Sequence, residues 1–293
     1  MSGEFDYQRV VFGLGWALDR GDRNLGGLRL DRALRALEAR PETLTGRILE
    51  AGCGVGRFTA PLAAHLPRGR IAAFDLSAAA LSEAARSTEA GGSRVAAGYA
   101  AADALALPYA TATFDALLFF DLLEHLSRPE VALAEFARVV RPGGLLHGYV
   151  PCEGQRPTLH AMMGRWVHRW TARHAGHVQH FRHAEVVDWV GAAGFRVGQT
   201  EYSYHLLGQA LDVATFAARE AIFRRQAARA DGQTGSADRP AAYYDRSVIE
   251  NRGVVTVYDA VRRRVERGAY AEARMLARCP WALGLHITAE RLC

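Results

Sequence analysis

Lysine is absent from this sequence of 293 residues, so its 36 basic side chains other than histidine are all arginines. The absence excludes chemistry that depends on a lysine amine, such as Schiff-base formation, and the phosphate loop that carries a lysine. The arginines occur mostly singly, and the formal net charge is only +5. A basic stripe is therefore not favoured, and we expect no nucleic-acid partner.

Cysteines and long apolar runs are also scarce. The four cysteines are far apart and form no C-x-x-C pair, which excludes a disulfide scaffold and argues against a zinc ribbon. This usage is typical of a reducing compartment, so we expect a cytoplasmic protein. No run approaches the roughly 18 apolar residues that a membrane span needs. The apolar run 10–18 follows an acidic start, unlike a signal peptide.

The pattern of apolar strand, turn and amphipathic helix repeats between residues 47 and 150. Helical spacing also occurs at residues 30–37 and 186–193. Strands that alternate with helices predict an α/β fold with a doubly wound parallel sheet, covered on both faces. The expected strands are 48–51, 70–74, 94–100, 114–120, 145–150, 195–204 and 283–290.

A glycine-rich turn follows the first predicted strand. Residues 52–56 read G-x-G-x-G and open a predicted helix, so backbone N–H groups at the helix start can face a negative group. The spacing differs from the G-x-G-x-x-G of dinucleotide-binding turns, because Arg57 occupies the third glycine position. A tight turn without a ligand is the alternative.

Two aspartates follow the next two predicted strands. Asp75 ends the second strand, about 20 residues after the glycine turn, where a carboxylate can accept both hydroxyls of a ribose. Asp103 follows the third strand and could accept from an adenine amino group. The alternatives are a solvated aspartate ahead of a helix for Asp75 and a loop-capping aspartate for Asp103.

With residues 114–126 and 138–144, these motifs resemble the class I S-adenosylmethionine-dependent methyltransferases of the small-molecule branch (methyltransferase type 11, UbiE-like). The resemblance covers residues 47 to about 197 and the last strand, and Val140 departs from its R-x-L-x-P-G-G motif. It implies a seven-stranded sheet of order 3-2-1-4-5-7-6 with strand 7 antiparallel. It also implies in-line methyl transfer from S-adenosylmethionine to a small, partly apolar metabolite, with S-adenosylhomocysteine as product.

The resemblance implies cofactor contacts at specific positions. The glycine turn would approach the methionine part, Asp75 the ribose, and Asp103 the adenine amino group. The aromatic pair at the end of the fourth strand would line the sulfonium region. The implied cofactor residues are Glu50, Gly52, Cys53, Gly54, Gly56, Asp75, Leu76, Asp103, Ala104, Phe119 and Phe120.

Histidines are concentrated between residues 160 and 183. The last four stand three apart, which could align them on one helix face as a metal site. The resemblance instead implies a metal-free wall of the acceptor site, and plain packing is a third alternative. We assign no metal ligands, and His180, His177 and His125 are the candidate catalytic residues, although packing at a helix start also suits His125.

We expect three regions. Residues 1–45 form an N-terminal helical segment, a lid or acceptor side. Residues 46–204 plus 281–293 form the S-adenosylmethionine-binding domain. Residues 205–280 form a helical insertion between strands 6 and 7 with two apolar stripes, either an acceptor cap or a homodimer interface. The alternatives to an enzyme that methylates a small-molecule acceptor are a non-catalytic cofactor-binding subunit, a nucleotide-dependent dehydrogenase and a histidine-based metal-binding module.

Overall fold

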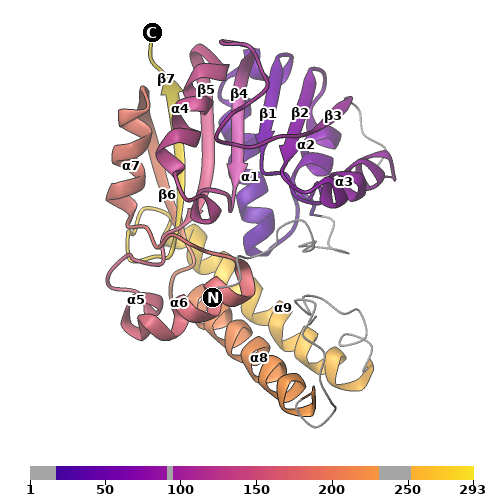
Figure 1. The fold of residues 1–293 in the computed structure, drawn as a ribbon, viewed down its shortest axis with the longest axis vertical. Helices are drawn as coiled ribbons and strands as arrows, with labels where there is room; N and C mark the ends of the chain where they lie inside the picture. Colours follow the sequence, from indigo (N-terminus) through magenta and orange to yellow (C-terminus); the bar gives the residue numbers. More distant parts are fainter. Residues whose placement is uncertain (1–17, 91–94, 231–251) are drawn as a thin grey trace.

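The computed structural model describes residues 18–90, 95–230 and 252–293. Its centre is a seven-stranded sheet of order β3-β2-β1-β4-β5-β7-β6, in which β7 runs antiparallel to both neighbours. The predicted fold class is therefore confirmed (Figure 1). The strands are β1 (Arg47–Ala51), β2 (Arg70–Asp75), β3 (Ala97–Ala101), β4 (Phe114–Phe120), β5 (Val140–Pro151), β6 (Phe195–Ser203) and β7 (Gly284–Arg291).

Helices cover both faces of the sheet, as the apolar strands require. Helices α4 and α7 pack on one face, in a cluster with Phe119 and Phe136. Helices α1 and α2 pack on the other face, in a cluster with Phe58 and Phe120. The helices are α1 (Leu25–Glu38), α2 (Thr59–His65), α3 (Ala78–Ala90), α4 (Pro129–Val139), α5 (Leu159–Met163), α6 (Arg165–Ala175), α7 (His183–Ala192), α8 (Leu206–Ala230) and α9 (Arg252–Met275).

The parallel strands end toward α5, α6, α8 and α9, which gather beyond their carboxyl ends (Figure 1). Helices α8 and α9 lie side by side and form the expected insertion between β6 and β7. Leu25 and Leu28 of α1 pack against Ala269 and Ala273 of α9. The insertion is therefore anchored to the sheet through α1.

The apolar stripes of the insertion are partly open to solvent. Leu207 is 42% exposed and Val261 is 55% exposed. Residues 231–251 of the insertion lie outside the described residues, as do residues 10–17 of the apolar run near the N-terminus. Within the described part of the chain, every helix is too short or too polar to cross a membrane.

The predicted start of the fifth strand at residue 145 is wrong. Helix α4 already ends at Val139, and β5 begins at Val140. The strand pairing then shifts register between Phe114 and Ala116, so the proline and glycines form an irregular stretch inside β5. The Arg141 guanidinium donates to Asp115 of β4 across this stretch at 2.6 Å, which holds it against the sheet. The third strand also starts later than predicted, at Ala97, and Arg94 lies outside the described residues.

Candidate functional site

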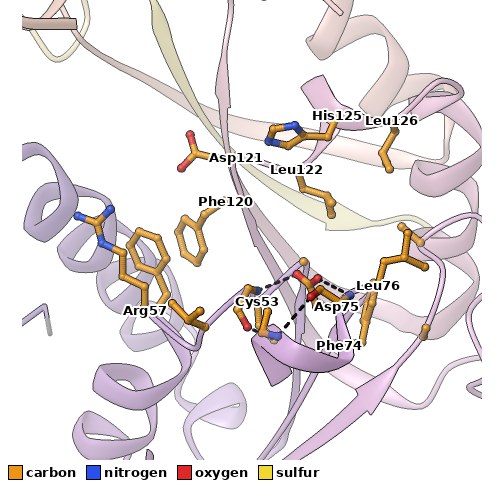
Figure 2. Close-up of a pocket in the computed structure, with 18 of the residues that line it drawn as sticks. Cys53, Arg57, Phe74, Asp75, Leu76, Phe120, Asp121, Leu122, His125 and Leu126 are labelled. Carbon is orange, nitrogen blue, oxygen red and sulfur yellow. Dashed lines mark hydrogen bonds between the residues drawn. The ribbon is translucent and has the colours of Figure 1, made fainter. Parts of the chain in front are cut away.

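A cavity of about 390 Å³ opens at the carboxyl ends of β1, β2 and β4 (Figure 2). Its volume falls within the range of about 300–1,000 Å³ that small-molecule sites have. It lies where open α/β sheets bind their ligands. The predicted site residues that line it are Gly52, Cys53, Gly54, Asp75, Leu76, Asp103, Ala104, Phe120, His125 and His177. Glu50, Gly56, Phe119 and His180 do not line it.

The glycine turn forms the floor of this cavity. Gly54 has a φ of +52°, a conformation that side chains rarely adopt, and a Cβ built there meets no atom within 4 Å. The space above Gly54 is thus open to a ligand. Gly56 has another role, because a Cβ at that position would come within 3.0 Å of Ala84. Its missing side chain lets α3 approach the turn.

Asp75 is joined to the turn by hydrogen bonds. One carboxylate oxygen accepts from the Gly54 N–H at 2.8 Å, and the other accepts from the Ser77 N–H at 2.9 Å (Figure 2). The Ser77 hydroxyl oxygen accepts from the Ala80 N–H in the first turn of α3, as a residue that caps a helix does. These contacts fix the carboxylate at the cavity wall. A carboxylate has lone pairs beyond these two bonds and can accept further donors.

Asp103 and its neighbours form the far wall. The Asp103 carboxylate accepts from the Leu105 N–H at 2.9 Å, so the aspartate caps its own loop while it lines the cavity. Ala104 is buried beside it, whereas Leu76 is 53% exposed. These two apolar side chains and the carboxylate form a shallow slot with one hydrogen-bond acceptor.

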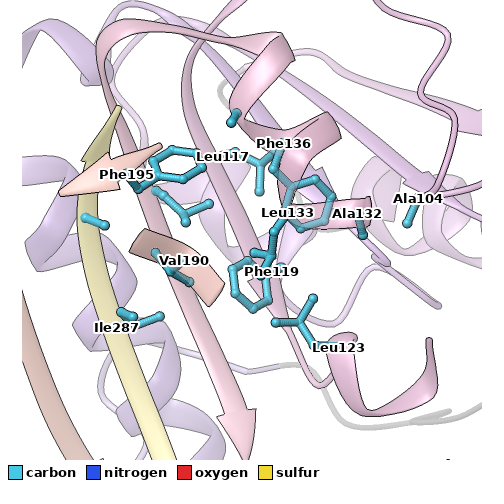
Figure 3. Close-up of a cluster of buried hydrophobic side chains, with 14 of the residues drawn as sticks. Ala104, Leu117, Phe119, Leu123, Ala132, Leu133, Phe136, Val190, Phe195 and Ile287 are labelled. Atoms are coloured by element: carbon cyan, nitrogen blue, oxygen red, sulfur yellow. The ribbon is translucent and has the colours of Figure 1, made fainter. Parts of the chain in front are cut away.

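The expectation that both phenylalanines line the cavity is contradicted for Phe119. Successive side chains of a strand point to opposite faces, so adjacent residues cannot share one wall. Phe120 faces the cavity and stacks on Phe58 with ring centroids 4.0 Å apart. Phe119 is fully buried on the other face, against Phe136 of α4 (Figure 3).

Glu50 also lies outside the cavity wall. Its side chain is 1% exposed and accepts a hydrogen bond from the Thr59 hydroxyl of α2 at 2.6 Å. Burial raises the pKa of Glu50 to about 8. The glutamate therefore ties the glycine turn to the helix that follows it, instead of facing a ligand with its side chain.

Two charged residues that line the cavity were not among the predicted site residues. Asp121 directly follows β4 and pairs with Arg29 of α1, whose guanidinium lies 3.7 Å from the ring centroid of Tyr149. Asp121 also has a φ of +49°, an uncommon conformation away from glycine. Its position after an apolar strand is the same signal that identifies Asp75. Arg57 follows the turn and also lines the cavity.

On the acceptor side, Glu124, His125 and His177 come together. One donor atom of each lies within 4.8 Å of the others. Glu124 is fully buried, and neither carboxylate oxygen accepts a hydrogen bond from any residue that the structure describes. Burial raises the pKa of Glu124 to about 8 and, with the charge of His177, lowers the pKa of His125 to about 3.

Glu153, which sequence reasoning also missed, holds two of the predicted histidines. Its carboxylate accepts from His177 Nδ1 at 2.8 Å, from His180 Nδ1 at 2.9 Å and from the Thr171 hydroxyl at 3.0 Å. Burial alone would lower the pKa of His177, but Glu153 outweighs it and raises that pKa to about 9. Burial alone would raise the pKa of Glu153, but His177 and His180 hold it well below its usual range.

The four histidines spaced three apart do not share a helix face, which was the alternative that would have favoured a metal site among them. Helix α6 ends at Ala175, and Gly176 follows in the left-handed conformation, so the chain turns away before His177. His174 remains on α6 and pairs with Glu220, while His183 begins α7. His180 stacks on His168, with ring centroids 3.7 Å apart, behind Glu153. Only His177 of these four reaches the cavity.

Residues 49–147 match the model of a methyltransferase domain family. This part of the chain is similar to a methyltransferase domain. The match runs from β1 into β5 and includes Gly54, Asp75, Asp103 and His125, whereas His177 and α5 to α9 lie beyond it.

Curated proteins and solved structures are also similar to this chain. A ubiquinone/menaquinone biosynthesis C-methyltransferase from Syntrophotalea carbinolica is 32% identical over 147 residues, which cover 50% of this chain and 59% of that protein. A malonyl-[acyl-carrier protein] O-methyltransferase from Hahella chejuensis is 35% identical over 99 residues, 34% of each chain. The YcgJ protein from Bacillus subtilis shares the fold of the methyltransferase domain, with a TM-score of 0.56, 14% identity, and coverage of 91% of this chain and 99% of that chain.

The matched segments span less than two thirds of the curated relatives. The shares of the two sequence relatives named above are 59% and 34%. The common part is therefore the methyltransferase domain.

Proposed function

We propose that the protein transfers a methyl group from S-adenosylmethionine to a small, partly apolar metabolite. The observation that carries this proposal is the pairing of the Asp75 carboxylate with the Gly54 N–H on the wall of a 390 Å³ cavity. Both residues lie inside the segment that matches the methyltransferase family. Their pairing places a carboxylate and an open glycine turn side by side, as a nucleoside with a charged tail requires.

The residues of the cavity fit this cofactor. A side chain at residue 54 would project into open space, so the turn is a cradle that only glycine leaves free. Asp75 would accept the ribose hydroxyls, and Asp103 would accept the adenine amino group. Leu76 and Ala104 would flank the adenine ring, and Phe120 would lie near the methionine part.

S-adenosylmethionine supplies a methyl group on a sulfonium, and in the transfer the acceptor's lone pair forms the new bond while the C–S electron pair stays on sulfur. The chain has to position the acceptor and exclude water. Leu122, Leu126 and the His125–His177 pair line the part of the cavity left for the acceptor. Apolar walls with few polar groups suit a small, partly apolar acceptor.

We also propose that three regions of the chain have different roles. Residues 46–204 plus 281–293 bind the cofactor, residues 1–45 close the acceptor side, and residues 205–280 cap the acceptor. Support for the cap comes from hydrogen bonds between α8 and α5, which include His160 Nε2 to Asp212 at 2.9 Å and the Leu159 N–H to Gln209 at 2.6 Å. A homodimer through the exposed stripes of α8 and α9 is the other use of this insertion.

Isotope labelling tests the proposed function. The protein is incubated with S-adenosylmethionine that carries a deuterated methyl group and with a cell metabolite extract, and products are examined by mass spectrometry. We expect a metabolite that gains the labelled methyl, together with S-adenosylhomocysteine, and at limiting cofactor concentration much less of both products with the Asp75→Ala variant. Tight cofactor binding with no labelled product in any extract would instead support a non-catalytic cofactor-binding subunit.

A further inference from the structure

Glu124 is a buried carboxylate whose surroundings point to a ligand. It lies in the short 3-10 turn Leu123–His125 after β4, is 0% exposed, and both carboxylate oxygens lack hydrogen-bond donors among the described residues. A buried, ionised carboxylate without a partner is strongly unfavourable, so such groups are normally protonated, paired or bound to a cation. The arrangement around Glu124 indicates which of these applies.

Each of the two histidines beside Glu124 is oriented by a hydrogen bond from its Nδ1 atom. His125 Nδ1 donates to the Gly176 carbonyl at 3.3 Å, and His177 Nδ1 donates to Glu153 at 2.8 Å. Metal-ligating histidines almost always donate one ring N–H to a carbonyl or carboxylate in this way, and that bond directs the other nitrogen to the ion. In this cluster His125 donates to a carbonyl and His177 donates to a carboxylate.

The backbone sets the distance between the segments that carry these side chains. The Glu124 carbonyl accepts from the Val178 N–H at 2.9 Å and from the Gln179 N–H at 3.1 Å. These bonds fasten the turn after β4 to the segment after α6. The positions of Glu124, His125 and His177 are therefore fixed by the fold and not by long flexible side chains alone.

The spacing of the donor atoms is close to that of ligands on one ion. His125 Nε2 lies 3.8 Å from Glu124 Oε1, and all three donors lie within 4.8 Å of one another. Tetrahedral bonds of about 2 Å place two ligands of one ion about 3.3 Å apart, so closure around an ion needs these separations to shorten by up to about 1.5 Å. Two imidazoles and one carboxylate suit zinc or another divalent transition metal, and do not suit magnesium or calcium.

We propose that Glu124, His125 and His177 bind one divalent transition-metal ion, with zinc as the reference ion, at the acceptor end of the cavity. Glu153 is the positioning residue that orients His177. Three protein ligands leave at least one coordination position open, and His125 and His177 both face the cavity. That position would take an oxygen or nitrogen atom of the acceptor. Binding of the acceptor by the ion rests on the proposed methyl transfer. The metal site itself does not depend on that proposal.

Two other buried histidines contrast with this cluster. His160 is paired with Asp212, and His174 is paired with Glu220, each at 2.9 Å. Each of these carboxylates therefore already has a hydrogen-bonded partner. In the Glu124 cluster the carboxylate has two nitrogens nearby but no hydrogen bond, which is the pattern that an ion between them would satisfy.

The test is a metal titration of the full-length, untagged protein after chelator treatment. Calorimetry with Zn²⁺ measures affinity and stoichiometry, and Co²⁺ absorption in the visible range reports nitrogen and oxygen coordination. The isosteric Glu124→Gln variant removes one ligand, and His125→Gln removes another should the first fold poorly. The control is His180→Gln, which alters the other histidine on Glu153 without touching a ligand.

We expect the wild type to bind one Zn²⁺ per chain. The affinity of His180→Gln for Zn²⁺ should stay within about threefold of the wild type. The affinity of Glu124→Gln should fall by more than the roughly 10–100-fold that is typical when a residue behind a metal ligand is changed. No binding at millimolar Zn²⁺, equal binding by Glu124→Gln, or an equal loss in the control would overturn the proposal. S-adenosylhomocysteine is titrated in parallel. Its failure to bind would refute the proposed function and leave the metal result standing.

Discussion

Replacement of Asp75 by alanine should weaken cofactor binding far more than it weakens the fold. The carboxylate already accepts from Gly54 and Ser77 at 2.8 and 2.9 Å, so its position at the cavity wall is set before a ligand arrives. A hydrogen bond to a charged group contributes about 1.5–3 kcal/mol. Loss of one such bond to a ribose hydroxyl weakens binding at least about tenfold, and loss of two weakens it at least about 100-fold.

Calorimetric titration with S-adenosylhomocysteine measures this effect, and circular dichroism and thermal unfolding establish that the variant is folded. Glu83→Gln is the matched control, because it also removes a carboxylate near this edge of the sheet. Glu83 sits on α3, pairs with Arg86 at 2.6 Å and does not line the cavity. We expect the control to bind within about twofold of the wild type. Unchanged affinity in a folded Asp75→Ala protein would refute the assignment of Asp75 to the ribose.

Three further predictions concern the turn, the aromatic pair and the buried histidines. Gly54→Val should abolish S-adenosylhomocysteine binding, because it places a side chain in the open space above the turn and strains a φ of +52°; retained binding would show that the turn is structural only. Phe119→Ala should destabilise the fold by about 3–5 kcal/mol in chemical denaturation and leave the affinity for S-adenosylhomocysteine within about threefold. Phe120→Ala should weaken that affinity directly. The reverse pattern would contradict the faces of the sheet assigned to the two side chains. In the folded protein, burial and then the charge of Arg32 lower the pKa of His147 to about 3, below the ordinary value of 6.5. The contribution of His147 to stability is therefore complete above pH 6.5 and is lost as the pH falls toward 3. Denaturation at a series of pH values should show a shallower loss in His147→Gln, and an identical slope would contradict the assignment of this loss to His147.

The parallel core of the fold was predictable because its signals are local. The strands around 48–51, 70–74 and 114–120 are short apolar runs, and glycine or aspartate ends each of them. The order of strands came from the resemblance alone, since sequence periodicity does not specify which strands pair. The irregular start of β5 was missed because proline and glycine normally indicate a turn, whereas Asp115 and Arg141 hold them in the sheet.

The candidate site was predictable where it depends on the ends of strands and not where it depends on distant segments. Asp75 ends β2 and Asp103 stands two residues after β3. Asp121 and Glu153 stand one and two residues after their strands and could have been found by the same rule. Phe119 was misplaced because the family motif was applied without the alternation of side chains along a strand. The histidine spacing suggested a helix face, but Gly176 ends α6 before His177. The contact of Glu124 with His125 and His177 depends on tertiary folding, which no local pattern reports.

A crystal structure of the complex with S-adenosylhomocysteine tests the central claim most directly. We expect the ribose on Asp75, the adenine between Leu76 and Ala104 with its amino group near Asp103, and the homocysteine over Gly54. The sulfur should then face the part of the cavity that His125 and His177 line. A ligand bound elsewhere, or one whose sulfur points away from these histidines, would contradict the proposed methyl transfer at this site.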